Sequence, residues 1–299
     1  MGRRKSQPIN CISSNASRDW AQIYSIYGLD APTTLLFLLV VHALLLFVLS
    51  LLLLLHSPTL PFHPPRPLAA LLATLSAISS LILLLAAANI LYSSVGLRWE
   101  MSQRMLGAVA DWGSVRRALD VGCGRGMLLC AVALRLKKEG GCGRVVGVDG
   151  GKDGALRTLK TAGIEGVQEY VTCREGDVRR LPFNDDYFDV VVSGAFLHRV
   201  GKELGQKTAA AAAERVRVLG ELVRVLKPGG IGVVWDLVYV PEYVKKLQEL
   251  KMEDIRVSER ITAYLTSSHI VSFHKPSQHV AGPVDEVRLD WRSNNLSLC

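Results

Sequence analysis

The hydrophobic positions of this chain first form two long apolar runs, residues 35–55 and 68–92, neither of which contains a formally charged residue. As a helix, each run is long enough to cross the hydrocarbon core of a bilayer, which is about 30 Å thick. Residues 56–67 between them contain five prolines and cannot continue a helix. We therefore expect a transmembrane hairpin over residues 33–92, preceded by an N-terminal arm of residues 1–32.

Beyond the hairpin, short apolar runs alternate with amphipathic stretches, which predicts an α/β domain. Residues 98–112 have helical apolar spacing and predict an amphipathic helix within a linker of residues 93–116. The alternating domain covers residues 117–276, and residues 277–299 read as a loosely ordered tail. The runs that predict strands are residues 117–121, 144–149, 188–193, 231–236, 254–259 and 269–273. Helices are predicted over residues 127–137 and 209–226.

A carboxylate and three glycines stand where the first predicted strand gives way to a helix. Asp120 precedes Gly122, Gly124 and Gly126, and Met127 occupies the place where a dinucleotide-binding turn would need its third glycine. A carboxylate at this point repels a pyrophosphate but suits a ligand with an ammonium or sulfonium group, and S-adenosylmethionine carries both. The alternative is that the glycines serve only tight packing between strand and helix.

Two further aspartates follow at the ends of later segments. Asp149 ends the second predicted strand, where a carboxylate can accept hydrogen bonds from ribose hydroxyls. Asp177 stands in the polar segment before Leu181-Pro-Phe183. Asp149 could instead cap a helix, and Asp177 could serve a turn. Together with the order of the strands, cofactor binding is the better interpretation of both.

With these motifs in this order, residues 118–276 resemble class I S-adenosylmethionine-dependent methyltransferases of the type 11 group. The resemblance implies an enzyme with a Rossmann-like α/β fold, in which a seven-stranded, mostly parallel sheet has helices on both faces and an antiparallel last strand. It implies S-adenosylmethionine as cofactor and no metal. The residues that it implies for the cofactor are Asp120, Gly122, Cys123, Gly124 and Gly126 at the methionine part and the turn, Asp149 at the ribose, Asp177 and Val178 at the adenine, and Ser193 and Gly194 under the methyl group.

Methyl transfer needs a general base only if the acceptor must lose a proton, because positioning supplies much of the acceleration. His198, just after the fourth predicted strand, is the best candidate for such a base, and Asp236 at the end of the fifth is the next. A histidine at the former position also occurs in the family without a role in proton transfer.

The absence of certain motifs from the sequence restricts the classes of methyl acceptor. The fourth strand is followed by Ser193-Gly-Ala-Phe196, so the D/N-P-P-Y/F motif of nitrogen methylases and the paired acids of magnesium-dependent catechol methylases are missing. The net charge of +8 is spread out, with no basic block that demands nucleic acid. A small or lipid-like acceptor, such as a prenylated phenol, quinol, sterol or lipid amine, is expected. Two alternatives stay open: methylation of a membrane-associated protein, and a non-catalytic S-adenosylmethionine-binding membrane protein.

The distribution of basic residues predicts a multi-pass membrane protein with both termini and the catalytic domain facing the cytosol. Arginines and lysines cluster before and after the hairpin, whereas the loop within it holds only Arg66. The six cysteines show neither a C-x-x-C pair nor zinc-ligand spacing, which indicates reduced thiols. The membrane bilayer is an expected partner, while organelle and oligomeric state are left open.

Overall fold

A mixed β-sheet forms the centre of the computed structural model, which describes residues 23, 26–27, 33–55, 66–151, 154–205, 207–263 and 266–277. Its strands lie in the order β3-β2-β1-β4-β5-β8-β6, and β7 pairs with β8. The strands are β1 (Arg117–Val121), β2 (Arg144–Asp149), β3 (Val171–Glu175), β4 (Phe188–Gly194), β5 (Leu226–Leu237), β6 (Glu253–Val257), β7 (Ile261–Ala263) and β8 (Thr266–His274). The pairs among β1 to β5 are parallel, and β8 runs antiparallel to β5.

The expected Rossmann-like α/β sheet is present, but it has eight strands instead of seven. The additional strand arises because β6 and β7 both pair with the outer edge of β8, one after the other. Between them the chain leaves the regular ladder at Ser258, whose backbone N–H donates to the carbonyl of Ile270 at 2.8 Å and whose hydroxyl accepts from the Ile270 N–H at 2.9 Å. The predicted strand over residues 254–259 is thus the first half of a broken edge strand.

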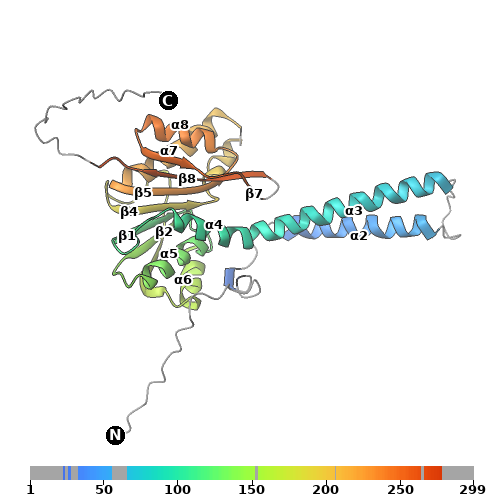
Figure 1. Ribbon diagram of the computed structural model, residues 1–299, viewed down its shortest axis with the longest axis horizontal. Coiled ribbons are helices and arrows are strands. Elements are labelled where there is room, and N and C mark those ends of the chain that lie inside the picture. The colour runs from blue at the N-terminus through green and yellow to red at the C-terminus, as the bar shows by residue number, and fades with distance from the viewer. Residues whose placement is uncertain are drawn as a thin grey trace, which may run out of the picture.

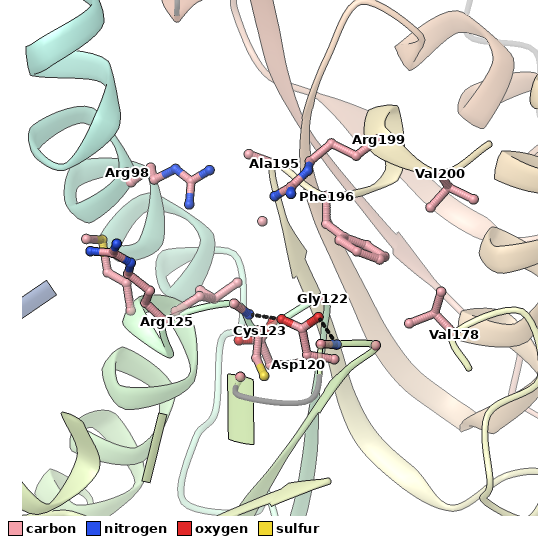
Figure 2. Close-up of a pocket in the computed structure, with 18 of the residues that line it drawn as sticks. Arg98, Asp120, Gly122, Cys123, Arg125, Val178, Ala195, Phe196, Arg199 and Val200 are labelled. Atoms are coloured by element: carbon pink, nitrogen blue, oxygen red, sulfur yellow. Dashed lines mark hydrogen bonds between the residues drawn. The ribbon is translucent and has the colours of Figure 1, made fainter. Parts of the chain in front are cut away.

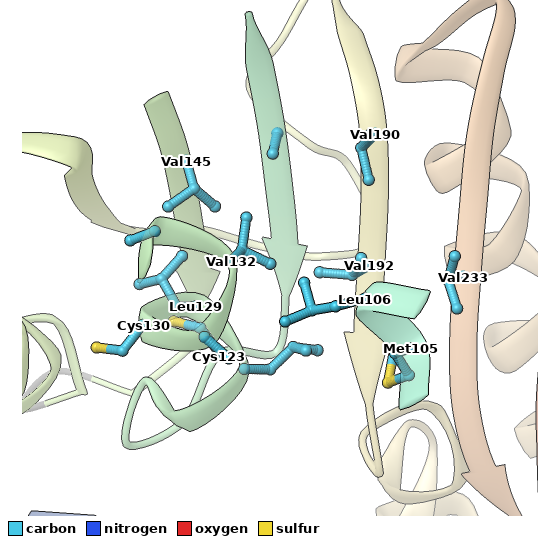
Figure 3. Packing of buried hydrophobic residues seen from close by; sticks show 14 of the residues in the cluster. Met105, Leu106, Cys123, Leu129, Cys130, Val132, Val145, Val190, Val192 and Val233 are labelled. Atoms are coloured by element: carbon cyan, nitrogen blue, oxygen red, sulfur yellow. The ribbon is translucent and has the colours of Figure 1, made fainter. Parts of the chain in front are cut away.

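Helices cover both faces of the sheet (Figure 1). They are α4 (Gly96–Gly107), α5 (Met127–Lys138), α6 (Gly154–Ile164), α7 (Ala209–Val225) and α8 (Val240–Glu249). On one face, Met105 and Leu106 of α4 and Leu129 of α5 pack against strand residues such as Val192, as Figure 3 shows. On the other face, α7 and α8 bury a second cluster that includes Tyr243. Because strand residues point alternately to the two faces, neighbours in one strand serve different cores.

The helix α4 is shorter than the sequence predicts. It ends at Gly107, whereas the helical spacing continues to Trp112. Glycine is a poor helix former, and the chain turns there so that the indole N–H of Trp112 donates to the carbonyl of Leu106 at 3.0 Å. Trp112 is therefore buried from a loop instead of from a helix.

Two long helices, α2 (Thr33–Leu55) and α3 (Arg66–Ser94), pack side by side and extend away from the sheet (Figure 1). Both are long and apolar enough to cross a membrane, judged by length and composition. Small residues are buried between them, including Ala43, Ala73 and Ser80, and the Ser80 hydroxyl donates to the Ala43 carbonyl at 2.8 Å. Large apolar side chains face outward, with Phe37 67% and Leu85 61% exposed. The proline-rich connection, residues 56–65, lies outside the described residues, as do most of the N-terminal arm and residues 278–299.

Candidate functional site

A cavity of about 700 Å³ opens at the carboxyl ends of the parallel strands. It lies beside β1, whose two neighbours β2 and β4 continue the sheet in opposite directions. Crevices at such switch points are the usual ligand sites of open α/β sheets, and this volume is in the range of small-molecule sites. The lining residues come from β1, the turn after it, the ends of β2 and β4, and helix α4.

The turn between β1 and α5 is held in a conformation that only glycine adopts without strain. Gly122, Gly124 and Gly126 have φ values of +75°, +53° and +82°. The Gly122 N–H donates to the carbonyl of Val148 at 2.8 Å, which ties the turn to β2. Gly122 and Gly124 line the cavity together with Cys123, whereas Gly126 precedes α5 and packs against Thr158. The structure therefore brings two of the three predicted glycines to the cavity.

Gly122 also lies directly under the ring of Phe196. A Cβ atom at Gly122 would be 2.0 Å from the Phe196 ring, far inside van der Waals contact. Gly124, by contrast, has no atom within 4 Å of a built Cβ. Phe196 lines the cavity from the segment after β4 and is not among the predicted site residues.

Asp120 is buried at the floor of this cavity, with 1% of its surface exposed. Its Oδ2 atom has no hydrogen-bond partner among the described residues. Burial raises the pKa of this carboxyl well above 3.8, and the nearby Cys173 and Asp149 raise it further. A buried carboxylate oxygen without a hydrogen-bond partner is costly, and a cationic ligand would supply the missing charge.

Asp149 ends β2 and braces the glycine turn from the other side. Its carboxylate accepts hydrogen bonds from the backbone N–H of Gly124 at 2.8 Å and of Gly151 at 3.3 Å (dashed in Figure 2). Each carboxylate oxygen retains acceptor capacity, so the group can still meet a ligand hydroxyl. Asp177 and Val178 line the same cavity, and the Asp177 carboxylate accepts from the Arg179 N–H at 2.9 Å.

At the end of β4, one of the two residues expected at the cofactor site lies away from the cavity. Gly194 lines the cavity, but Ser193 does not, because its buried hydroxyl donates to the carbonyl of Val121 at 2.8 Å. The next residue, Ala195, lines the cavity with φ +50°, a region that non-glycine residues rarely adopt. Its N–H donates to the carbonyl of Trp235 at 2.7 Å. This hydrogen bond helps hold a strained turn at the cavity wall.

The two candidate bases lie outside the set of cavity-lining residues. Asp236 is fully buried and follows Trp235 in β5, so its side chain faces the α8 side while that of Trp235 faces the cavity. The Asp236 carboxylate is 2.5 Å from Nδ1 of His198 and accepts from the His198 backbone N–H at 2.7 Å and the Tyr243 hydroxyl at 2.8 Å. Asp236 anchors the segment after β4 through these hydrogen bonds, and a role of His198 or Asp236 as a base stays a prediction.

The thiols of Cys123 and Cys173 lie 3.6 Å apart beside the turn. Their hydrogen bond and burial raise the pKa of Cys123, so this thiol is held in its neutral form. Among the described residues, no group of three or more histidine, cysteine or acidic side chains could hold a metal ion.

Residues 119–234 match the sequence profile of a family described as "Methyltransferase domain". The match covers less than half of the chain and indicates similarity to methyltransferase domains over this segment. The matched segment begins in β1 and ends in β5, so it contains the glycine turn, all three cavity aspartates and the strained end of β4.

Individual relatives also match part of the chain. The demethylmenaquinone methyltransferase of Lactobacillus johnsonii is 32% identical over 118 residues, which cover 39% of this chain and 42% of the relative. The 2-phytyl-1,4-naphtoquinone methyltransferase of Nostoc punctiforme is 36% identical over 124 residues, 40% of this chain and 45% of the relative. A SAM-dependent methyltransferase from Aquifex aeolicus, a solved structure, is 20% identical with a TM-score of 0.43, over 57% of this chain and 88% of that one. The chain spans less than half the length of these two curated relatives.

Several residues around the cavity were not identified from the sequence. They are Arg98 and Met105 of α4, Arg199 in the short helix η2 (Leu197–Arg199), and Ala195, Phe196 and Trp235. Ala195 and Phe196 could have been predicted, because they stand immediately after the fourth strand, where cavity residues are expected. Arg98 reaches the cavity because α4 packs over the sheet, whereas Trp235 reaches it from β5.

Proposed function

We propose that this protein is an S-adenosylmethionine-dependent methyltransferase. The observation that carries the proposal is the buried Asp120, whose raised pKa and unpartnered oxygen indicate a site made for a cation. S-adenosylmethionine has an ammonium and a sulfonium group. A cavity of about 700 Å³ with this carboxylate under a glycine turn suits such a ligand better than a phosphate.

The chain has residues for each part of the cofactor. Asp120 and the backbone of the turn at residues 122–124 would hold the methionine part, and Asp149 would accept from the ribose hydroxyls. Asp177 and Val178 would meet the adenine. When bound, the cofactor supplies a methyl group on a positively charged sulfur, which is transferred by in-line displacement. The protein contributes position, charge complementarity to the ammonium, and exclusion of water by the ring of Phe196.

The proposed acceptor is small or lipid-like. The support comes from two observations: relatives that match 39% and 40% of the chain bear the names of quinone methyltransferases, and the chain has two apolar helices beside the cavity domain. Their outward-facing Phe37 and Leu85 would be exposed to water in a soluble protein, and a bilayer would cover them.

We further propose that α2 and α3 anchor the protein as a transmembrane hairpin, with the catalytic domain on the cytosolic side. Residues 56–65 between the two helices contain no lysine or arginine and Arg66 begins α3, whereas basic residues are frequent before and after the hairpin. Helix α4 begins two residues after α3 ends, so the hairpin would hold the cavity close to the membrane surface.

The test is transfer of a radiolabelled methyl group by the full-length protein in liposomes, with total membrane extract as acceptor. The organic, aqueous and protein fractions are counted, and Asp120→Ala and Asp149→Ala are run alongside. Label in the organic fraction that is lost in both variants is the expected result. Label confined to protein would favour methylation of a membrane-associated protein. Cofactor binding without transfer to any fraction would contradict an acceptor in the membrane and leave either a soluble substrate or a non-catalytic S-adenosylmethionine-binding protein.

A further inference from the structure

The two thiols beside the glycine turn come from segments that lie 50 positions apart in the sequence. Cys123 lies in the turn, between Gly122 and Gly124, and Cys173 lies in β3. Both are free thiols, and their sulfur atoms are 3.6 Å apart. The sulfur atoms of a disulfide are about 2.05 Å apart, so this pair would have to close by about 1.5 Å to form one.

A glycine in the strand between the two cysteines makes their contact possible. In β2, Gly147 pairs with Asp120 of β1 on one side and with Cys173 of β3 on the other. A Cβ atom at Gly147 would be 2.8 Å from the sulfur of Cys123, which is closer than van der Waals contact. Because Gly147 has no side chain, the side chain of Cys123 lies over β2 and reaches Cys173.

The two thiols differ in exposure and in acidity. Cys123 is buried, with 7% of its surface exposed, whereas Cys173 is half-buried. The hydrogen bond with the Cys123 thiol lowers the pKa of Cys173 against the opposing effect of burial, and a hydrogen bond with Thr158 lowers it further. Peroxides oxidise the thiolate form of cysteine, so Cys173 is the member of the pair that reacts first.

Cys123 belongs to the backbone that would bind the methionine part of the cofactor. Its N–H donates to the carbonyl of Val148 at 3.3 Å, and the N–H of Gly124 donates to the Asp149 carboxylate at 2.8 Å. Cys173 is held by the regular pairing of β3 with β2, whereas Cys123 has a flexible glycine on each side. Closing the gap between the sulfur atoms therefore displaces the turn and strains both hydrogen bonds.

We propose that Cys123 and Cys173 are a redox switch, in which a peroxide converts the two thiols into a disulfide and the disulfide pulls the turn out of its ligand-binding conformation. The effect on the cofactor rests on the proposed function, whereas formation of the disulfide does not. Disulfides in cytosolic proteins are usually transient and redox-sensing, and a cellular dithiol or glutathione would reduce this one back to two thiols.

The oxidation proceeds in two balanced steps. The Cys173 thiolate attacks one oxygen of hydrogen peroxide, so the O–O bond breaks, hydroxide leaves and a sulfenic acid forms on Cys173. The sulfur of Cys123 then attacks the sulfur of the sulfenic acid, and the sulfenic oxygen leaves as water with the proton of the Cys123 thiol. The hydroxide from the first step takes up a proton, so two thiols are oxidised and one peroxide is reduced to two waters.

The test treats the full-length protein in detergent with hydrogen peroxide and measures the binding of S-adenosylhomocysteine by calorimetry before and after. Remaining thiols are alkylated, and disulfides are mapped by mass spectrometry of peptides. We expect a disulfide between Cys123 and Cys173 and an affinity that is about tenfold or more weaker, as for the loss of one hydrogen bond to a charged group. Dithiothreitol should restore the affinity, and bound S-adenosylhomocysteine should slow formation of the disulfide, because it holds the turn in place.

Variants of the cysteines separate the switch from general oxidation damage. Cys173→Ser should bind S-adenosylhomocysteine as the untreated wild type does and lose the response to peroxide. Cys142→Ser is the matched control: Cys142 is exposed and does not line the cavity, so this variant should respond as the wild type does. Cys173→Ala and the unfolding midpoint of each variant show whether the serine itself disturbs β3.

Three results would overturn the proposal. They are the absence of a disulfide between Cys123 and Cys173 after peroxide treatment, an unchanged affinity in protein that carries this disulfide, and a loss of affinity with peroxide that persists in both variants of Cys173.

Failure of the proposed function would look different. If the reduced protein binds neither S-adenosylmethionine nor S-adenosylhomocysteine, the methyltransferase proposal fails. The switch is then followed by the peptide map and by the unfolding midpoint of the oxidised protein. A disulfide that shifts this midpoint in the wild type but not in Cys173→Ser would support the switch, and the absence of the disulfide or of the shift would overturn it.

Discussion

Replacing Gly122 by alanine tests whether the ring of Phe196 closes on the glycine turn. Gly122 has φ +75°, which costs an L-residue roughly 1–2 kcal/mol. The new Cβ would also lie 2.0 Å from the Phe196 ring, and relieving such an overlap in a packed site costs roughly 1–3 kcal/mol. Together these effects predict destabilisation by about 2–5 kcal/mol.

Gly124→Ala is the matched control for this prediction. Gly124 has φ +53°, but no atom lies within 4 Å of a built Cβ, so only the backbone strain of roughly 1–2 kcal/mol is expected. The difference between the two variants isolates the contact with Phe196. In a double-mutant cycle, Gly122→Ala with Phe196→Ala should recover about 1–2 kcal/mol relative to the sum of the single changes.

The assay is thermal unfolding of the detergent-solubilised full-length protein, with S-adenosylmethionine binding measured by calorimetry on the same samples. Gly122→Ala should also weaken cofactor binding by about tenfold or more, because Phe196 lines the cavity and must move. Equal destabilisation by the alanines at Gly122 and Gly124, together with zero coupling to Phe196, would refute the close approach of ring and turn.

Three other predictions concern the aspartates and the hairpin. Asp120→Asn should abolish S-adenosylmethionine binding, measured by calorimetry, yet stabilise the empty protein at neutral pH. The pKa of the Asp120 carboxyl is raised in the folded protein, so the wild type loses stability as the pH rises from 3.8 through that raised value. Unfolding measured over this pH range would disprove the reasoning if the variant kept the pH dependence of the wild type. Asp236→Asn should lower the free energy of unfolding by roughly 2–4 kcal/mol, because the new amide N–H₂ group would face N–H and O–H donors. The affinity for the cofactor should stay near that of the wild type. A loss of affinity without destabilisation would instead indicate that Asp236 contacts the ligand directly. Ser80→Ala should weaken the pairing of α2 and α3 by about 0.6 kcal/mol, because the hydrogen bond to the Ala43 carbonyl is lost. The measurement is thermal unfolding in lipid nanodiscs, with the outward-facing Ser79→Ala as control. Equal effects of the two changes would contradict the interhelical role of Ser80.

The sequence predicted those parts of the fold that depend on neighbouring residues. Strands β1 and β2 begin and end at the predicted residues, and α5 and α7 differ from prediction by one residue at their C-terminal ends. The two long helices extend the predicted apolar runs by two residues at most at each end. Periodicity and turn chemistry are local properties, so they can be recognised without knowing what packs against them.

Predictions for single elements failed where a distant contact decided the outcome. The helix expected to continue to Trp112 ends at Gly107, where the indole finds the Leu106 carbonyl. The predicted edge strand is broken in two because its partner β8 is long enough to pair with both halves. His198 follows β4 as expected and Asp236 lies near the end of β5, but the alternation of side chains in β5 turns Asp236 away from the cavity.

The chemistry of the glycine turn can be recognised from neighbouring residues: a carboxylate followed by glycines at alternate positions specifies that turn through backbone geometry and charge. Which side chains face the turn depends on how the elements pack. Arg98 and Arg199 are about a hundred positions apart and meet over one cavity because α4 crosses the sheet beside the end of β4. Their approach depends on strand order and helix packing, which are set by burial of both faces of the sheet and leave no local trace along the chain.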